Sequence, residues 1–401
     1  MKSAVENKQV VLGLTGSIAC YKAVDLCSKL VQAGALVDVI LSRGAAQFVT
    51  PLTFRSITHR PVVTDMFDPG SEFSVEHVSL AQRADVVVVA PATAHTIAKL
   101  ALGLADDSIT TTVLATSAPV VVAPAMDARM YDNPATQENL AKLRSRGITV
   151  VGPGQGRLAS GLLGWGRLLE STELLGHIAA VLGLHGDLAG RTVVVSAGGT
   201  VEALDPVRVI TNRSSGKMGY AIAEAARDRG ARTILVTAPT TLPDPSALEV
   251  HHVESALEMR DVVASLSRNA DVLLMAAAVS DYRSVATAEQ KIKKGSEDTL
   301  TLHLTRNPDI LANTQGPKVK VGFAAETEDL IANTRQKLVS KNVDLFVAND
   351  VTAAGAGFGT DTNKVTILDR NGDAQDLPLM TKYEVAHHVL DRVMELLRQK
   401  G

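Results

Sequence analysis

The chain has 401 residues, of which 46% are hydrophobic and 21% are charged, and its net charge is −3. This length predicts two or three domains, and the composition is that of an ordinary soluble globular protein. The near balance of charges and the 3% content of aromatic residues argue against nucleic acid as a partner. The N-terminus is polar and the apolar runs are only as long as strands, so we expect a cytoplasmic protein without a membrane partner.

Short valine-rich strands alternate with helical patterns in the first half of the chain. Strands are expected at 10–14, 37–41, 85–90, 119–123 and 149–151, and helices at 19–33 and 134–146. Such continuous apolar strands are typical of a parallel sheet that helices cover on both faces.

The same pattern restarts at Arg191. Strands are expected at 193–195, 233–236, 271–275, 320–323 and 344–347, with helices between them. A glycine-punctuated segment at 185–190 predicts a hinge, and we place the domain boundary between residues 187 and 188. The expected fold class is α/β, with two doubly wound domains in series at 1–187 and 188–401.

The segment I-T-N-R-S-S-G-K-M-G at 210–219 lies between a glycine turn and a helical pattern. Its side-chain donors are Asn212, Arg213, Ser214, Ser215 and Lys217. Amides at the start of a helix attract anions, which favours a phosphate-rich ligand. The segment is not a P-loop, because Met218 stands where Ser or Thr would hold magnesium. Taken alone, it fits an ordinary polar turn that caps a helix equally well.

A second glycine turn, G-L-T-G-S-I-A at 13–19, opens the first domain. It is similar to a dinucleotide fingerprint but reads G-x-x-G-x-x-A. Ser42 and Arg43 stand where an acidic residue would contact the ribose of NAD. The turn therefore favours the phosphate of a mononucleotide over a nicotinamide dehydrogenase.

Nearly the whole chain resembles the bacterial family in which a phosphopantothenoylcysteine decarboxylase is fused to a phosphopantothenate–cysteine ligase. The ligase motifs occur in family order at 197–208, 210–219, 276–283, 291–294, 307–311, 322–327 and 348–351. The resemblance implies a flavodoxin-like flavoprotein domain at 1–187 and a Rossmann-like ligase domain at 188–401.

For the ligase domain the resemblance implies that CTP, with Mg²⁺ or Mn²⁺, activates the carboxylate of 4′-phosphopantothenate as an acyl-cytidylate. The amine of cysteine then attacks to form an amide. Asn212 matches the residue that stabilises the acyl intermediate, and Lys291 matches a catalytic lysine, although Lys291 alone would more often belong to a solvated charge run. The matched nucleotide contacts are Met275, Ala276, Ala277, Asp281, Lys291, Pro308, Asp309, Ile310, Leu311, Phe323, Lys337 and Lys341. Metal ligands are left unassigned.

For the first domain the resemblance implies FMN-dependent oxidation of the substrate thiol, loss of carbon dioxide, and reduction to 4′-phosphopantetheine. His77 matches the catalytic histidine, although such a residue alone is more often structural. The matched flavin contacts are Gly16, Ser17, Ile18, Ala19, Ser42, Pro91 and Thr93.

The chain departs from the family pattern at two positions that handle substrate. Asp127 replaces an Asn that donates to the substrate carboxylate, so it would have to be protonated or paired, for example with Arg129. Ser160 replaces a proton-donating Cys, and an alcohol is a far poorer acid. Two interpretations remain open: a working decarboxylase with altered proton delivery, or a flavin-binding scaffold or regulator beside an active ligase.

The resemblance also implies a homo-oligomer. It would have trimeric contacts between decarboxylase domains and dimeric contacts between ligase domains, and a dodecamer would satisfy both. Sequence gives no independent support for this assembly.

Overall fold

The computed structural model describes residues 3–66, 76–293, 299–326, 330–350, 355–357 and 359–400. The chain divides into two compact units, residues 1–182 and 183–401. The predicted hinge at 185–190 lies at the start of the second unit. The boundary between a decarboxylase domain and a ligase domain at residues 187 and 188 stays a prediction. Among the described residues, no helix is long and apolar enough to cross a membrane.

Six parallel strands form the sheet of the first unit, in the order β3-β2-β1-β4-β5-β6. They are β1 (Gln9–Leu14), β2 (Leu36–Leu41), β3 (Val62–Val63), β4 (Val86–Ala92), β5 (Val120–Pro124) and β6 (Thr149–Val150). Apart from the very short edge strand β3, the order is that of flavodoxin-like sheets, 2-1-3-4-5. The expected fold class of this half is therefore confirmed.

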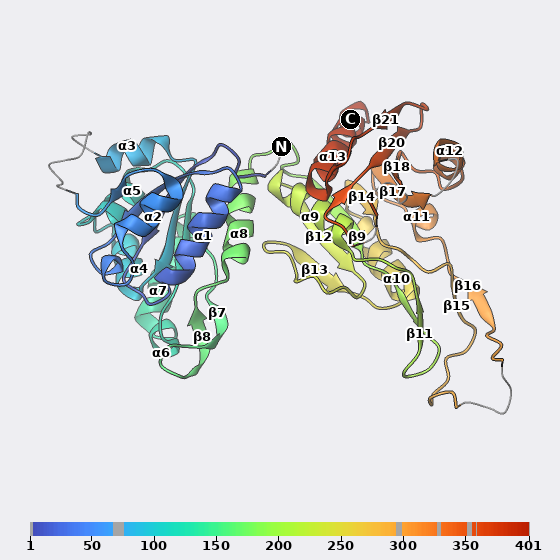
Figure 1. Cartoon of the computed structure of the whole chain (residues 1–401), viewed down its shortest axis with the longest axis horizontal. Coiled ribbons are helices and arrows are strands. Elements are labelled where there is room, and N and C mark those ends of the chain that lie inside the picture. The colour runs from blue at the N-terminus through green and yellow to red at the C-terminus, as the bar shows by residue number, and fades with distance from the viewer. Residues whose placement is uncertain are drawn as a thin grey trace. The chain divides into compact units, whose positions relative to one another are not determined.

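Helices cover both faces of this sheet (Figure 1). They are α1 (Cys20–Gln32), α2 (Pro51–Thr58), α3 (Glu76–Arg83), α4 (Ala94–Leu102), α5 (Ser108–Ala115), α7 (Pro134–Ser145) and α8 (Ser171–Gly183). Side chains of a strand alternate between its faces, so Leu12 packs in the core with α1 and α8, while Val11 packs in the core with α4 and α7. A four-residue helix, α6 (Ala128–Tyr131), and the hairpin β7–β8 (Gly154–Arg157, Leu163–Arg167) follow the carboxyl end of β5 in the chain.

The second unit has an eight-stranded sheet in the order β13-β12-β9-β14-β17-β18-β20-β21. The strands are β9 (Thr192–Ala197), β12 (Arg232–Thr237), β13 (Glu249–His252), β14 (Val272–Met275), β17 (Val319–Glu326), β18 (Leu345–Asp350), β20 (Val365–Asp369) and β21 (Ala374–Asp376). The first six are parallel and follow the 3-2-1-4-5-6 order of a Rossmann sheet, as expected. The antiparallel strands β20 and β21 were not anticipated from the sequence.

Two layers of helices complete the second unit. Helices α9 (Lys217–Asp228) and α13 (Lys382–Gln399) pack on one face of the sheet. Helices α10 (Ala256–Ser267), α11 (Ile310–Asn313) and α12 (Leu330–Ser340) pack on the other. The helix that was expected to follow the motif at 210–219 begins inside it, at Lys217, so its first turn contains the end of the motif.

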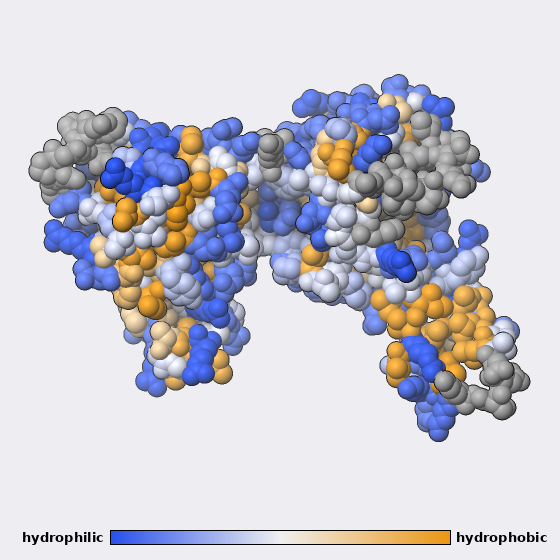
Figure 2. All heavy atoms as spheres, viewed as in Figure 1, coloured by the Kyte–Doolittle hydropathy of each residue, from blue (hydrophilic) through white to orange (hydrophobic). Residues whose placement is uncertain are grey.

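Two hairpins, β10–β11 (Val201–Ala203, Val209–Thr211) and β15–β16 (Tyr282–Ser284, Leu304–Arg306), project from the sheet of the second unit (Figure 1). Figure 2 shows a dense group of hydrophobic side chains over this projection. Its exposed apolar residues are Val207, Val209, Tyr282, Val285, Leu300, Leu302 and Leu304. We call this set the apolar arm.

Candidate functional site

The first unit holds a cavity of about 610 Å³ near the carboxyl ends of β1, β4 and β5. Crevices at this edge of a parallel sheet are the usual ligand sites of such folds. The predicted flavin residues Gly16, Ser17, Ile18, Ala19 and Thr93 line it, and so do Asp127 and Ser160. Sequence reasoning assigned no role to Tyr21, Lys22, Met130, Arg157 and Arg167, which line it as well.

Thr15 joins the two loops that carry most of the predicted flavin residues. Its buried hydroxyl donates to the Pro91 carbonyl at 2.7 Å and accepts from the Thr93 backbone N–H at 2.9 Å. Pro91 thus lies behind the cavity wall and fixes the loop that carries Thr93. The sequence offered no signal for Thr15 beyond its place in the glycine turn.

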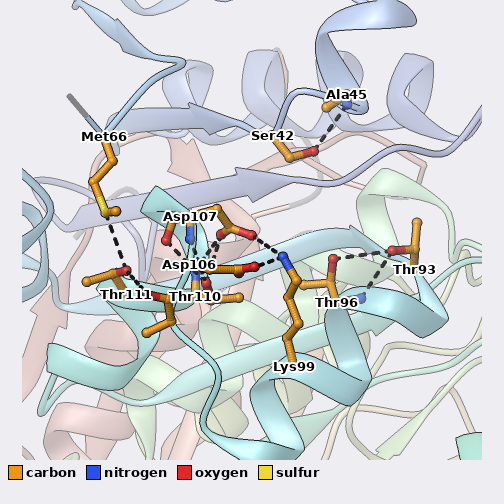
Figure 3. Close-up of polar contacts among 11 residues, drawn as sticks. Ser42, Ala45, Met66, Thr93, Thr96, Lys99, Asp106, Asp107, Thr110 and Thr111 are labelled. Carbon is orange, nitrogen blue, oxygen red and sulfur yellow. Dashed lines mark hydrogen bonds and ion pairs between the residues drawn. The ribbon is translucent and has the colours of Figure 1, made fainter. Parts of the chain in front are cut away.

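Ser42 has a similar supporting position on the loop after β2. Its hydroxyl accepts from the Ala45 backbone N–H at 3.1 Å, and Ser42 does not line the cavity (Figure 3). Figure 3 also shows Lys99 of α4 with Asp106 and Asp107, at 2.6 and 3.0 Å from its ammonium nitrogen. This ion-pair cluster fixes the connection between α4 and α5.

Gly16 makes a close backbone approach beside the cavity. A Cβ atom at this position would lie 3.0 Å from the Gly44 Cα, which is backbone and cannot rotate away. The two glycines therefore let the chain turn tightly just before α1, which places the start of this helix beside the cavity. The loop fits the phosphate of a mononucleotide.

Gly16→Val is expected to weaken flavin binding by roughly 5- to 150-fold, because overpacking against backbone costs about 1–3 kcal/mol. The flavin content of the purified protein, read from its absorbance, measures this. Gly154→Ala is the control, since a Cβ there would make only ordinary contacts, at 3.4 Å or more, and its φ lies outside the left-handed region. An unchanged flavin content in Gly16→Val would contradict a phosphate site at this loop.

His77 lies on α3, where it is half-buried, and it does not line the cavity of its own chain. Helix α3 contacts α5, and its Leu80 packs in the core cluster that includes α4 and α7. One copy of the chain therefore does not bring His77 to Asp127 and Ser160. The catalytic role of His77 stays a prediction.

Asp127 and Ser160, the two departures from the family pattern, contact each other. The Ser160 hydroxyl donates to Asp127 Oδ2 at 2.6 Å, and the Arg129 backbone N–H donates to Asp127 Oδ1 at 3.0 Å. The hydrogen bond from Ser160, and to a smaller extent the one from the Arg129 backbone, lowers the pKa of Asp127. The carboxylate is thus paired and ionised, and its side-chain partner is Ser160 where we had expected Arg129.

The second unit holds a cavity of about 350 Å³ beside the start of α9. The motif at 210–219 lines it from Asn212 to Gly219. Of the predicted nucleotide contacts, Ala276, Ala277 and Phe323 line it. The remaining lining residues are Ala278, Ala324, Asn349, Gly357, Asn363 and Lys382.

Glycines bring the first turn of α9 against the end of β9. A Cβ on Gly219 would lie 2.6 Å from the Ala197 Cβ, and one on Gly216, whose φ is +74°, would lie 2.6 Å from the Thr240 side chain. Only glycine permits this approach, which places the amides at the start of a 12-residue helix beside the cavity.

Asn212 is held at the edge of this cavity by the loop that follows β14. Its side-chain amide donates to the Val279 carbonyl at 3.2 Å and to the Ala278 carbonyl at 3.5 Å. The backbone of Ala278 in turn donates to the Gly198 carbonyl at 2.8 Å. These contacts fix the orientation of the Asn212 side chain, and its role in stabilising the acyl intermediate stays a prediction.

Two lysines at this cavity are already engaged. The Lys217 ammonium donates to the Gly359 carbonyl at 2.8 Å and to Asp361 Oδ1 at 2.7 Å. The buried Lys382 ammonium donates to the carbonyls of Thr360 and Thr362 at 2.5 and 3.0 Å. We had counted Lys217 as a ligand donor, but here both lysines anchor the segment at 359–362, which lies in the chain between the lining residues Gly357 and Asn363.

Two carboxamide oxygens at this cavity have no partner among the described residues. They are the buried Oδ1 atoms of Asn349 and Asn363. Asn363 is only 2% exposed, so its unpaired oxygen would be costly without a ligand. A ligand with a hydrogen-bond donor at this end and anionic groups at the start of α9 would satisfy both halves of the cavity.

The other predicted nucleotide contacts do not line this cavity. Asp309 caps α11 by accepting from Ala312 N–H at 3.0 Å, and Lys341 pairs with Asp309 at 3.4 Å, so the amides expected at this helix start are partly satisfied by the protein itself. The rest lie elsewhere, with Met275, Ile310 and Leu311 buried, Pro308 and Lys337 half-buried, and Asp281 and Lys291 exposed. Three family motifs, at 291–294, 322–327 and 348–351, end in positions outside the described residues.

Comparison with known proteins gives two family models and many full-length relatives. The model "Flavoprotein" matches residues 1–183, and the model "DNA/pantothenate metabolism flavoprotein C-terminal domain" matches residues 188–397. The coenzyme A biosynthesis bifunctional protein CoaBC of Bacillus subtilis is 45% identical over 405 residues, covering 99% of both chains. The chain belongs to this bifunctional coenzyme A biosynthesis family.

Other members of the bifunctional coenzyme A biosynthesis family match over the same length. The Vibrio cholerae protein is 45% identical and covers 98% of this chain and 99% of its own, and the Escherichia coli protein is 40% identical with 99% of both covered. Among solved structures, the C-terminal domain of a CoaBC protein is 37% identical over 53% of this chain and 99% of its own, with a TM-score of 0.46. A PPC decarboxylase variant is 31% identical over 43% of this chain and 97% of its own, with a TM-score of 0.40.

The described residues contain no preformed metal-binding cluster of carboxylate, histidine or cysteine side chains. No group of three or more His, Cys, Asp or Glu side chains there could hold a metal ion.

Proposed function

We propose that the second unit joins cysteine to 4′-phosphopantothenate with CTP, and that the first unit decarboxylates the product to 4′-phosphopantetheine, as two steps of coenzyme A biosynthesis. The observation that carries the ligase proposal is the cavity at the start of α9. It combines helix amides and Arg213 at one end with the oxygen of the buried Asn363 at the other, an oxygen that has no partner among the residues that the structure describes. A nucleotide has matching anionic and hydrogen-bond-donor groups.

The ligase reaction concentrates negative charge, because a carboxylate attacks a triphosphate and pyrophosphate leaves. The α9 amides and Arg213 would stabilise that charge, and Mg²⁺ or Mn²⁺ would enter with the triphosphate. Asn212, fixed by the Val279 carbonyl, would place its amide against the acyl group of the cytidylate. The amine of cysteine would then attack this acyl group and release CMP.

In the first unit the residues fit FMN. The Gly16–Gly44 approach and the start of α1 would hold its phosphate, and the 610 Å³ cavity would take the substrate beside it. FMN, when bound, supplies the two-electron oxidation and reduction on which the decarboxylation depends. Asp127, Arg157 and Ser160 would contact the substrate.

A second function for the first unit is also supported by an observation. His77 does not reach the cavity in one chain, and the ionised Asp127 would repel a substrate carboxylate. A flavin-binding scaffold or regulator, impaired in decarboxylation, would tolerate both features. The ligase proposal is the same under either function.

We propose further that the protein is a cytoplasmic homo-oligomer without nucleic-acid or membrane partners. The apolar arm is an exposed hydrophobic surface of the kind that dimer contacts bury. A neighbouring copy could also bring His77 to the cavity of the first unit, as trimeric decarboxylase contacts would allow. A dodecamer satisfies both sets of contacts.

A coupled assay tests the function. Full-length protein with its flavin is given 4′-phosphopantothenate, cysteine, Mg²⁺ and one nucleoside triphosphate at a time, while pyrophosphate, carbon dioxide and the final thiol are followed separately. CTP should support pyrophosphate release that depends on cysteine. Failure of every triphosphate would contradict the ligase, whereas ligation without carbon dioxide release would favour the scaffold.

A further inference from the structure

Asp127 and Ser160 form one hydrogen-bonded pair at the wall of the first cavity. Asp127 precedes α6, and Ser160 lies in the turn that joins β7 to β8. The 2.6 Å bond from the Ser160 hydroxyl leaves the Asp127 carboxylate as the acceptor. In the free protein neither side chain can serve as a strong proton donor, because the acid is ionised and the alcohol is weak.

The charged groups around this pair come from four elements. Arg129 lies on the same short helix as Asp127, Arg157 ends β7, and Arg167 ends β8. Lys22 reaches the cavity from α1, and its ammonium pairs with Glu170 at 2.8 Å, as does Arg167 at 2.8 Å. Arg157 has no ion pair in the described part of the chain, so its charge is available to an anionic ligand.

We infer that Asp127 stores the proton that decarboxylation consumes: it binds one proton when a carboxylate ligand enters the cavity and gives it to the carbon atom from which carbon dioxide leaves. This inference rests on the proposed decarboxylase function. Ser160 is a positioning residue in this scheme, since its hydroxyl orients the Asp127 carboxylate toward the cavity.

The physical reason is the interaction of two like charges. A ligand carboxylate drawn toward Arg157 places a second negative charge beside Asp127, and two carboxylates that share a site bind one proton between them. When the carbon–carbon bond of the oxidised substrate breaks, carbon dioxide leaves as a neutral molecule. The electron pair and its negative charge remain on the substrate as an enethiolate, shared between sulfur and the carbon that lost carbon dioxide. Asp127 is then a strong acid next to a basic carbon, and the proton moves to that carbon.

The stoichiometry of the reaction agrees with this scheme. A carboxylate and one proton give carbon dioxide and a new carbon–hydrogen bond. The flavin accepts and returns two electrons, so it adds nothing to the net proton count. One stored proton per turnover is therefore sufficient, and an acidic residue at position 160 is not needed.

Proton uptake on ligand binding tests the inference without turnover. Full-length flavin-loaded protein is titrated calorimetrically, in buffers of different ionisation enthalpy, with 4′-phosphopantothenoyl-alanine, which has the carboxylate but no oxidisable thiol. The matched ligand is N-ethyl-4′-phosphopantothenamide, which lacks the carboxylate. Both ligands carry the same phosphate, so the difference in proton uptake between them reports the carboxylate alone.

We expect the carboxylated ligand to take up more protons, with the difference approaching one per site as the pH falls toward about 6. Asp127→Asn should abolish the difference, and the exposed Asp132→Asn should not change it. Ser160→Ala should move the uptake to higher pH, because a hydrogen bond that stabilises the charged carboxylate is lost. An equal uptake for both ligands, or a difference that persists in Asp127→Asn, would overturn the inference.

The experiments distinguish a failure of the inference about Asp127 from a failure of the proposed decarboxylase function. If the difference in proton uptake appears but authentic 4′-phosphopantothenoylcysteine releases no carbon dioxide, Asp127 binds the proton and the decarboxylase function fails. If carbon dioxide is released at an unchanged rate by Asp127→Asn, the decarboxylase stands and the proton comes from another group.

Discussion

Asn212→Asp is expected to lower the kcat of cysteine ligation by roughly 10²–10³-fold, the usual loss when one donor to a developing oxyanion is removed. The substitution is isosteric but replaces an amide donor by a carboxylate. The substitution also removes the hydrogen bonds from the side-chain amide to the Val279 and Ala278 carbonyls, at 3.2 and 3.5 Å. A negatively charged carboxylate would then face these two carbonyl oxygens. Steady-state pyrophosphate release with CTP, phosphopantothenate and cysteine measures the effect.

Asn269→Asp is the matched control for this experiment, because Asn269 is exposed in the turn after α10. It adds the same charge to the same unit and should leave kcat unchanged. If Asn212→Asp retains the rate of the parent protein while the control behaves as expected, Asn212 has no part in stabilising the acyl intermediate.

The free energy of unfolding of the second unit is expected to fall by about 3 kcal/mol as the pH drops from 6.5 to about 4. The cause is His387 on α13, which is buried, and whose Nε2 has no partner among the described residues. Burial, and then the positive charge of Arg229, lower the pKa of His387 from 6.5 to about 4. The unfolded chain therefore binds a proton that the folded unit excludes in this interval.

Hydrogen–deuterium exchange of the α9 and α13 amides, measured across this pH range, reports the opening free energy of the unit. His387→Gln removes the titrating group and should flatten the dependence of that free energy on pH, whatever its effect at neutral pH. The adjacent, half-buried His388→Gln is the control and should keep the slope. A slope that is the same in His387→Gln and the parent protein would assign the pH dependence to other groups.

Local sequence features predicted most of the parallel strands because these are continuous apolar runs, but they missed the short strands β3 and β13. Val86–Ala92 and Val120–Pro124 are two examples, and both lie close to their expected bounds. The motif at 210–219 indicated an anion site for an equally local reason, since glycines at 216 and 219 and a following helix are adjacent in the chain. Of the two antiparallel strands that were missed, β20 pairs with β18 and β21 pairs with β20. The exposed β21 has no hydrophobic pattern, so only its pairing defines it.

The sequence by itself determined the alternation of strands and helices, the two glycine turns, and the two substitutions at Asp127 and Ser160. Only the tertiary structure decided that these two residues, 33 positions apart, share a hydrogen bond. It likewise decided that Asn363 and Lys382 border the same cavity as Ser214, while Lys291 does not. The physical reason is that contacts between distant segments depend on strand order and on the packing of loops at the sheet edge, which no local pattern of residues specifies.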